Sequence, residues 1–429
     1  MLSNKKIGIA LSGGGYRAAI YHLGTLKVLN SLGILKNVDK LSTISGGSIT
    51  GASFCLHKGD FDTFEKKMFE ALTTKSVIRY VLLSWKFFRF ALFVLFFLAS
   101  AIILLFTKYA PLSILILISL FYLIIKYQFK IFPVSEIIEA AYDKFFYSGA
   151  VLADLCDKPE LAIGSTNLQT LRHFTFSKRK MEDSSYAYQK PPVYFEGKDF
   201  PVSRAVIASS CVPFAFTPIT IDIRFYKNPN QFGTVDPKLV DGGVYDNQGA
   251  HKLTQKNSSY KCDVVIVSDA GNKLPLEGSY NNTFALLLRT VDTFMARIKH
   301  FQMIQNLYNK SDAAVSFQSI GWDLDLCIIG FFDNLKNGNI SKEICEFHEL
   351  QEDWINDPTF FKVQIISHLE QRCNYENLKA NGLSKTQLDA IRKVGTNLTP
   401  IKCELAKNLI RHAEVITELQ VRLYCPFKI

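Results

Sequence analysis

Three short segments, far apart in the sequence, place a reactive or charged side chain among glycines. They are LSGGGYR at residues 11–17, TISGG at residues 43–47 and VDGGVYDN at residues 240–247. Each follows a short apolar run, so we expect each to form the turn that leaves a β-strand. Such turns can supply an anion-binding loop, a hydroxyl nucleophile and a carboxylate base, which are groups that acyl transfer uses.

The glycine run of the first segment predicts an anion-binding loop. Gly13, Gly14 and Gly15 let backbone N–H groups approach a ligand closely, and the N-terminus of a following helix adds favourable partial charge. Arg17 adds a positive charge at the same place. The anion could be a phosphate or the oxyanion that develops when an ester carbonyl is attacked. A tight glycine turn that binds no ligand is the alternative.

The same segment also fits a dinucleotide-binding loop. Gly13, Gly15 and Ala18 match the GxGxxA pattern, and Asp39 follows at about the distance expected of a ribose contact. A Walker P-loop does not fit, because the Gly-Lys-Ser/Thr ending is absent. The first segment therefore leaves several kinds of site open when it is taken alone.

The second and third segments supply a possible nucleophile and base. Ser45, at a strand-to-helix turn with Gly47 two positions later, fits a nucleophile elbow, although a Ser at such a place is most often a helix N-cap. Asp241 comes before two glycines, which is also the composition of an ordinary turn. A serine hydroxyl needs a base within hydrogen-bond reach, and a carboxylate serves when burial raises its proton affinity.

Taken together, the three segments resemble the patatin-like phospholipase family, which is related to the cytosolic group IV phospholipases. GGGYR, TISGG some thirty residues later and DGG far downstream occur in the order of that family. Residues 164–170 (GSTNLQT) resemble its strand and turn before the substrate region. Residues 205–213 (AVIASSCVP), with Pro218, resemble its small-residue helix and proline loop. The resemblance covers residues 5–70 and 150–275.

This resemblance implies a Ser–Asp dyad that needs no metal and no organic cofactor. Ser45 would be the nucleophile and Asp241 its sole partner. The oxyanion-hole amides would come from Gly13, Gly14 and Gly15, with Arg17 supporting that loop or stabilising the charge. The sequence departs from the family at Thr43, where the family usually has Gly. His251, ten residues after Asp241, is the one candidate for an alternative Ser–Asp–His order.

A long apolar stretch interrupts the region of resemblance. No Asp or Glu occurs between Glu70 and Glu136, and residues 90–106 and 110–125 are two uncharged apolar runs. Their lengths approach the roughly 20 residues of a membrane-spanning helix. Basic residues flank the pair on both sides, which by the positive-inside rule predicts cytosolic flanks: Lys75, Arg79, Lys86, Arg89, Lys126 and Lys130. Two buried core helices, or a re-entrant hairpin, are the alternatives.

The remaining patterns predict an α/β fold with a patatin-like sheet and flanking helices, interrupted by the hydrophobic hairpin and extended by C-terminal helices. Residues 5–70 give two strand–turn–helix units, which favour a largely parallel sheet. We divide the chain into the N-terminal part of the catalytic domain (1–70), a hairpin insertion (71–132), the rest of the catalytic domain (133–275) and a mostly helical extension (276–429). In the last part, residues 283–308 have amphipathic helical spacing.

Composition narrows the partners and the compartment. The formal net charge is +10, yet the basic residues are scattered, so an anionic membrane surface is a better expectation than nucleic acid. Nine dispersed cysteines without a CxxC pair predict reduced thiols in the cytosol. We therefore expect a membrane protein whose catalytic domain is on the cytosolic side, with phospholipid or lysophospholipid as substrate. The sequence predicts no oligomeric state.

The predicted function is a membrane-anchored serine lipid acyl hydrolase. Two alternatives use the same residues differently. A transacylase would pass the acyl group from Ser45 to another lipid or alcohol, and a non-catalytic membrane-tethered module would bind lipids or proteins without turnover. Because both Ser45 and Asp241 are present, the sequence favours an enzyme over the binding module.

Overall fold

A nine-stranded mixed sheet forms the centre of the protein. The computed structural model describes residues 5–271, 280–305 and 313–427. Five strands run parallel in the order β3-β2-β1-β8-β9. They are β1 (Ile7–Leu11), β2 (Lys40–Ile44), β3 (Glu160–Asn167), β8 (Val264–Asp269) and β9 (Ala314–Ser319). Four antiparallel strands extend the sheet beside β3, namely β4 (Arg172–Phe176), β5 (Met181–Asp183), β6 (Ile219–Thr220) and β7 (Lys238–Asp241).

One edge of β3 carries two strands that run toward each other. Residues 160–164 of β3 pair with β2 in parallel, and residues 165–167 pair with β7 antiparallel. Strand β4 occupies the opposite edge of β3. The carboxyl ends of β2 and β7 therefore meet, because Ile44 lies opposite Gly164 and Asp241 lies opposite Ser165.

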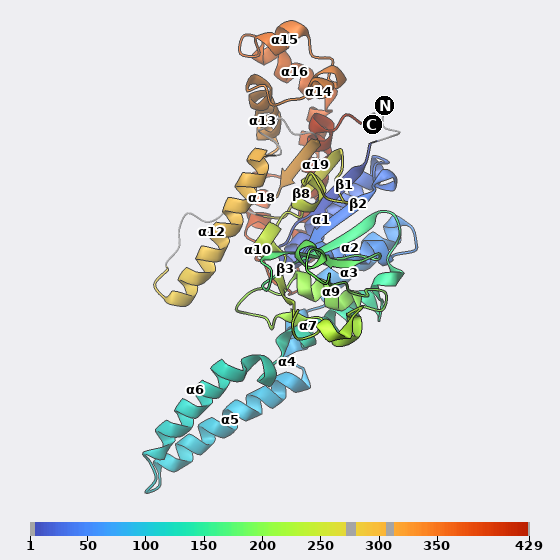
Figure 1. The fold of residues 1–429 in the computed structure, drawn as a ribbon. Helices are drawn as coiled ribbons and strands as arrows, with labels where there is room; N and C mark the ends of the chain where they lie inside the picture. The colour runs from blue at the N-terminus through green and yellow to red at the C-terminus, as the bar shows by residue number, and fades with distance from the viewer. Residues whose placement is uncertain (1–4, 272–279, 306–312, 428–429) are drawn as a thin grey trace.

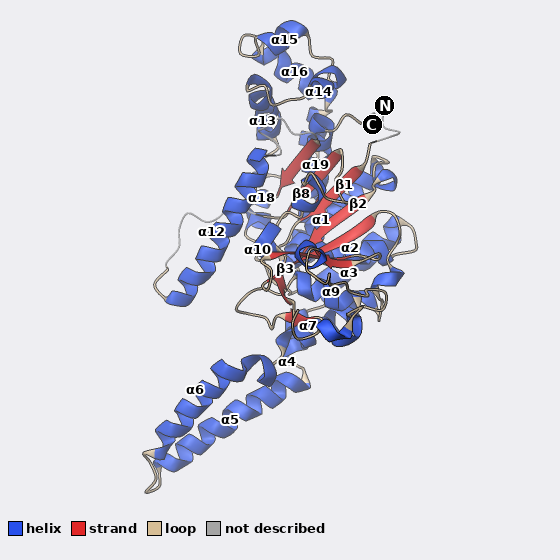
Figure 2. Ribbon diagram, viewed as in Figure 1, coloured by secondary structure: helices blue, strands red, loops and turns tan. Residues whose placement is uncertain are grey.

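Helices cover both faces of the sheet (Figure 2), as expected for parallel strands with uninterrupted apolar runs. On one face, Ile9 and Leu11 pack with helix α1 (Gly15–Ser31) and helix α2 (Gly46–Leu56). On the other face, Ala10 packs with residues that include Leu253 and Tyr260. Helix α19 (Cys403–Tyr424) lies against α1, where Gly24 allows the close approach because a Cβ would meet the backbone of Ile410.

The remaining helices lie around this core and at both ends of the molecule (Figure 1). They are α3 (Phe61–Thr74), α4 (Val77–Leu82), α5 (Trp85–Leu105), α6 (Leu112–Ile131), α7 (Val134–Tyr142), α8 (Ser184–Ala187), α9 (Val202–Ser209), α10 (Gly243–Asp246), α11 (His251–Thr254), α12 (Thr283–Met303), α13 (Asp325–Lys336), α14 (Lys342–Phe347), α15 (Glu352–Asn356), α16 (Lys362–Arg372), α17 (Tyr375–Ala380) and α18 (Lys385–Arg392). A second apolar cluster joins α13, α16 and α17 to α19.

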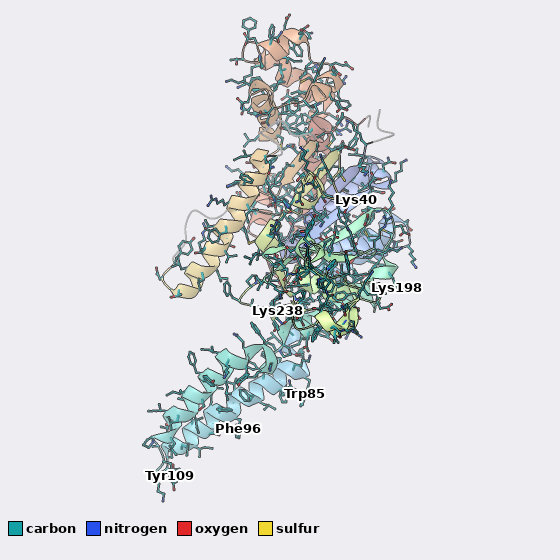
Figure 3. All side chains as sticks on the ribbon, in the orientation of Figure 1. Lys40, Trp85, Phe96, Tyr109, Lys198 and Lys238 are labelled. Carbon is teal, nitrogen blue, oxygen red and sulfur yellow. The ribbon has the colours of Figure 1, made fainter. Side chains whose placement is uncertain are left out.

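Helices α5 and α6 form a hairpin that projects away from the domain (Figure 1). Figure 3 marks its base with Trp85, its middle with Phe96 and its tip with Tyr109. The helical segments Trp85–Leu105 and Leu112–Tyr147 are long and apolar enough to cross a membrane, a criterion that core helices of soluble proteins also meet. Here only Ala101 of α5, and Ser113 and Leu120 of α6, are buried. The alternative of two buried core helices is therefore wrong.

The sequence predicted the fold class correctly, and the structure adds elements that it did not reveal. The two strand–turn–helix units predicted within residues 5–70 are confirmed as β1 with α1 and β2 with α2. The predicted helix at residues 283–308 is α12, although its last residues lie outside the described ones. Strand β9 and helix α19 belong to the central sheet and the main core, so the sheet continues past the sequence-based boundary at residue 275.

Candidate active site

Ser45 sits on a sharp turn between β2 and α2. Its backbone φ of 49° and ψ of −116° are unusual for a residue with a side chain, as expected at a nucleophile elbow. The residue occupies the N-cap position of α2, yet its side chain makes no capping hydrogen bond. Instead its hydroxyl interacts with the carboxyl of Asp241, whose pKa it lowers. An ordinary N-cap role for Ser45 therefore does not describe the structure.

A chain of hydrogen-bonded hydroxyl groups holds the Ser45 turn in place. The Ser45 backbone N–H donates to Ser209 Oγ at 2.8 Å, and Ser209 Oγ lies 2.9 Å from Ser48 Oγ. Ser48 Oγ in turn donates to Thr43 Oγ1 at 3.0 Å. All four residues are buried, so each bond is protected from competition by water.

Thr43 fits this turn although the family usually has glycine there. Its hydroxyl accepts the bond from Ser48, and its methyl group lies where a Cβ on Gly51 would be. The absence of a side chain at Gly51 in α2 thus leaves space for the methyl group of Thr43 in β2. The departure at Thr43 is accommodated by packing and by a hydrogen bond.

Asp241 ends β7 and faces Ser45. Burial raises the pKa of its carboxyl to about 6, against the opposing effects of hydrogen bonds from the Gly243 N–H and from Ser45. The Gly243 N–H donates to Asp241 Oδ1 at 2.7 Å. The backbone of Asp241 is held on both sides, because its N–H donates to Cys211 O at 2.8 Å and its carbonyl accepts from Thr166 Oγ1 at 2.9 Å.

The glycine loop lies directly against the Ser45 turn. A Cβ on Gly13 would come within 3.2 Å of the Ser45 Cβ, and a Cβ on Gly46 would collide with Gly15. Gly14 and Gly15 have φ angles of 140° and 59°, which favour glycine. The Gly13 N–H is engaged by the Asn247 carbonyl at 2.9 Å, whereas those of Gly14 and Gly15 donate no hydrogen bond within the described residues.

Arg17 lies on the first turn of α1, beneath this loop. Its Nη1 donates to the Val394 carbonyl at 2.9 Å, and its Nη2 lies 3.6 Å from the position of a Cβ on Gly14. Burial lowers the pKa of the Arg17 guanidinium, and the nearby carboxylate of Asp269 opposes that shift. The guanidinium thus ties the loop to the segment before α19.

The site also contains several residues that the sequence analysis did not single out. The side chain of Asn247 fills the space between Gly13 and Gly243, where neither could carry a Cβ. The Asn397 carbonyl accepts from the Tyr16 N–H at 2.9 Å and abuts Gly15. Ser209 and Asn247 lie inside the recognised segments, so a closer reading of polar residues there could have found them. Nothing in the sequence connects Asn397 to the glycine loop.

The rival interpretations of these residues find no geometric support. Asp39 accepts a hydrogen bond from the Ile7 N–H at 2.9 Å and pairs with Lys158 at 2.9 Å. The ring of His251 lies 5.5 Å from that of Tyr245, and its backbone N–H bonds to Asp246. No described hydrogen bond joins its ring to the dyad. No cluster of three or more His, Cys, Asp or Glu side chains that could hold a metal lies among the described residues.

The fold and the three turns define an α/β protein in which a serine, a buried carboxyl and a glycine loop lie together. A sequence model of the patatin-like phospholipase family matches residues 9–253, more than half of the chain. The chain belongs to the patatin-like phospholipase family, a family of lipid acyl hydrolases. No curated protein matches the sequence significantly.

The comparison with solved structures gives distant matches, of which two are described. Human GIVD cytosolic phospholipase A2 is 14% identical with a TM-score of 0.38, over 69% of this chain and 48% of that one. VipD from Legionella pneumophila is 15% identical with a TM-score of 0.34, over 96% of this chain and 91% of that one. The chain thus spans about half the length of the human enzyme.

The pKa of Asp241 predicts the acid limb of the pH profile. The carboxyl must be ionised to accept a proton, and its pKa is raised to about 6. For a water-soluble acyl ester, kcat/KM should therefore rise with pH through about 6 and level off above it, falling about tenfold per unit on the acid side. A limb centred near pH 4, or a flat profile from pH 5 to 8, would contradict this assignment.

The hydroxyl chain predicts a positioning role for Ser209. Ser209→Ala leaves the Ser45 N–H without its acceptor, which should lower kcat by about tenfold, since one buried hydrogen bond contributes about 1–1.5 kcal/mol. Ser210→Ala is the matched control, because its hydroxyl bonds to Val206 O and lies near Tyr142. We expect KM and the pH limb to stay unchanged in both variants. Equal kcat values for the two variants would contradict the positioning role of Ser209.

Proposed function

We propose that the protein is a membrane-anchored serine hydrolase that cleaves acyl esters of phospholipids or lysophospholipids with Ser45 and Asp241. One observation carries the proposal: the carboxyl ends of β2 and β7 meet on β3, which brings the Ser45 hydroxyl to a buried carboxyl, that of Asp241, whose pKa burial raises to about 6. A carboxylate of that pKa is ionised at neutral pH and is a stronger base than a solvent-exposed one. The family match supports lipid acyl hydrolysis in general.

The geometry supports a two-step reaction. Asp241 accepts the hydroxyl proton as Ser45 Oγ attacks the ester carbonyl, and the oxyanion forms beside the unengaged amides of Gly14 and Gly15. Collapse of the tetrahedral species breaks the ester bond, and the leaving alkoxide takes the proton from Asp241. Asp241 then removes a proton from water, which attacks the acyl-Ser45 ester. The fatty acid leaves, and Ser45 recovers its proton.

Gly13 has a structural role and does not contribute an amide to the oxyanion. Because its amide bonds to Asn247, we assign the oxyanion to Gly14 and Gly15, and Gly13 to the contact between the glycine loop and the Ser45 turn. Arg17 holds the loop through Val394. These assignments refine the set of residues expected from the sequence.

The hairpin supports membrane anchoring next to the site. Ser135, just after the hairpin, donates to the Thr217 carbonyl at 2.6 Å, and Cys211 Sγ donates to the same carbonyl at 3.1 Å. Cys211 also accepts the Asp241 N–H. A small cavity between the hairpin base and this loop is lined by Phe90, Phe132 and Phe214, among others. With basic residues on both flanks, we propose that 71–132 anchors the catalytic domain on the cytosolic side.

Fatty acid release from reconstituted vesicles tests the proposed function. We expect Ser45→Ala and Asp241→Asn to lower release by at least about 1,000-fold, because the two groups act as a unit. Asp236→Asn removes a half-buried acid that precedes the same strand and pairs with Lys238, and it should leave the rate unchanged. Thermal unfolding confirms that each variant is folded. Equal release by the wild type and Ser45→Ala contradicts the proposal, and acyl transfer to an added alcohol without release would identify a transacylase.

A further inference from the structure

Helix α12 leaves an apolar surface uncovered beside the candidate active site. We propose that its N-terminal half inserts into the surface of an anionic phospholipid bilayer, as a second membrane contact besides the hairpin. The inference rests on the proposed membrane anchoring and names a further surface and its partner.

The exposure of α12 argues for an apolar surrounding. Leu286, Leu287 and Leu288 are 54%, 46% and 38% exposed. Successive helical residues point about 100° apart, so three in a row cannot all face one protein surface. Phe294 and Phe301 continue the exposed apolar surface toward the C-terminus. None of the described side chains of α12 is buried, although the helix has 21 residues.

The position of α12 selects a bilayer as the occupant. In Figure 1 its N-terminal end and the α5–α6 hairpin extend from the same side of the domain, away from the α14–α16 end. The hairpin enters the membrane under the proposed function, so the leucines at the start of α12 approach the same surface. A second copy of the chain would require no such alignment with the hairpin.

The polar groups of this helix suit an anionic membrane surface. The Arg289 guanidinium lies 5.5 Å from the centre of the Tyr280 ring, and Tyr and Arg are residues that anchor segments at the membrane–water boundary. Arg297 adds an exposed cation, and the acid on the helix is Asp292. The hairpin flanks carry further lysines and arginines, such as Lys86 and Lys130, that would contact the same headgroups.

The inner side of α12 connects this surface to the dyad. Met295 Cε lies 3.0 Å from the position of a Cβ on Gly243, in the turn that follows Asp241. Lys299 pairs with the fully buried Asp269, whose pKa burial would raise and the ammonium holds below its usual range. A bilayer that receives Leu286–Leu288 would therefore lie close to the turn that carries the base.

Site-directed fluorescence in nanodiscs tests this contact without turnover. In a Ser45→Ala, Cys403→Ser background, an environment-sensitive dye is attached at Leu287→Cys, at Phe96→Cys in the hairpin, or at Val363→Cys. Val363 is 77% exposed on α16 and serves as the matched apolar control. In phosphatidylglycerol-containing discs, we expect nitroxide-labelled lipids to quench the dye at positions 287 and 96 and to leave position 363 unchanged.

The outcomes separate this inference from the proposed function. Quenching at 96 without quenching at 287 overturns the α12 contact and leaves anchoring intact, whereas no quenching at either position overturns both. A spectral change at 287 that grows with protein concentration and ignores the nitroxide lipids assigns the surface to a second copy and overturns the inference. Equal quenching at 287 in purely zwitterionic discs overturns the preference for anionic lipid.

Discussion

The candidate site depends on two strands that meet end to end along one edge of β3. Strand β2 approaches from one direction and stops at Ile44, and β7 approaches from the other and stops at Asp241. Backbone pairing to the same strand fixes both ends, so Ser45 and Asp241 are brought together although they lie far apart in the sequence. Strand β1 pairs with β2, and the glycine loop that follows β1 therefore lies against the Ser45 turn.

This arrangement buries the Asp241 carboxylate and the strained Ser45 turn, and neighbouring residues stabilise both. A residue held like Ser45 at positive φ costs on the order of 1–3 kcal/mol, and the bonds through Ser209, Ser48 and Thr43 hold it there. The carboxylate of Asp241 accepts a hydrogen bond from the Gly243 N–H and interacts with the Ser45 hydroxyl, and both limit the rise in its pKa that burial causes. The result is a buried carboxylate that is ionised near neutral pH.

Local glycine patterns were sufficient to predict the turns, because a tight turn is determined by neighbouring residues. The resemblance of those turns to one family led to the fold class, which the family match confirms. Contacts between distant segments could not be predicted in the same way. The antiparallel approach of β7, the Ser209 acceptor and the support from Asn397 all depend on strand register and on a C-terminal loop. Strand β9 and the uncovered side of α12 likewise emerge only from the packed chain.

Covalent labelling tests the central claim most directly, because it reports which side chain is the nucleophile. The reconstituted protein would be treated with a long-chain alkyl fluorophosphonate, which phosphonylates activated serines, and the modified peptide located by mass spectrometry. The account predicts one modification, on Ser45, that is lost in Ser45→Ala and strongly slowed in Asp241→Asn. Modification of a different serine with the same loss of activity, or fatty acid release that continues while Ser45 is fully modified, would contradict it.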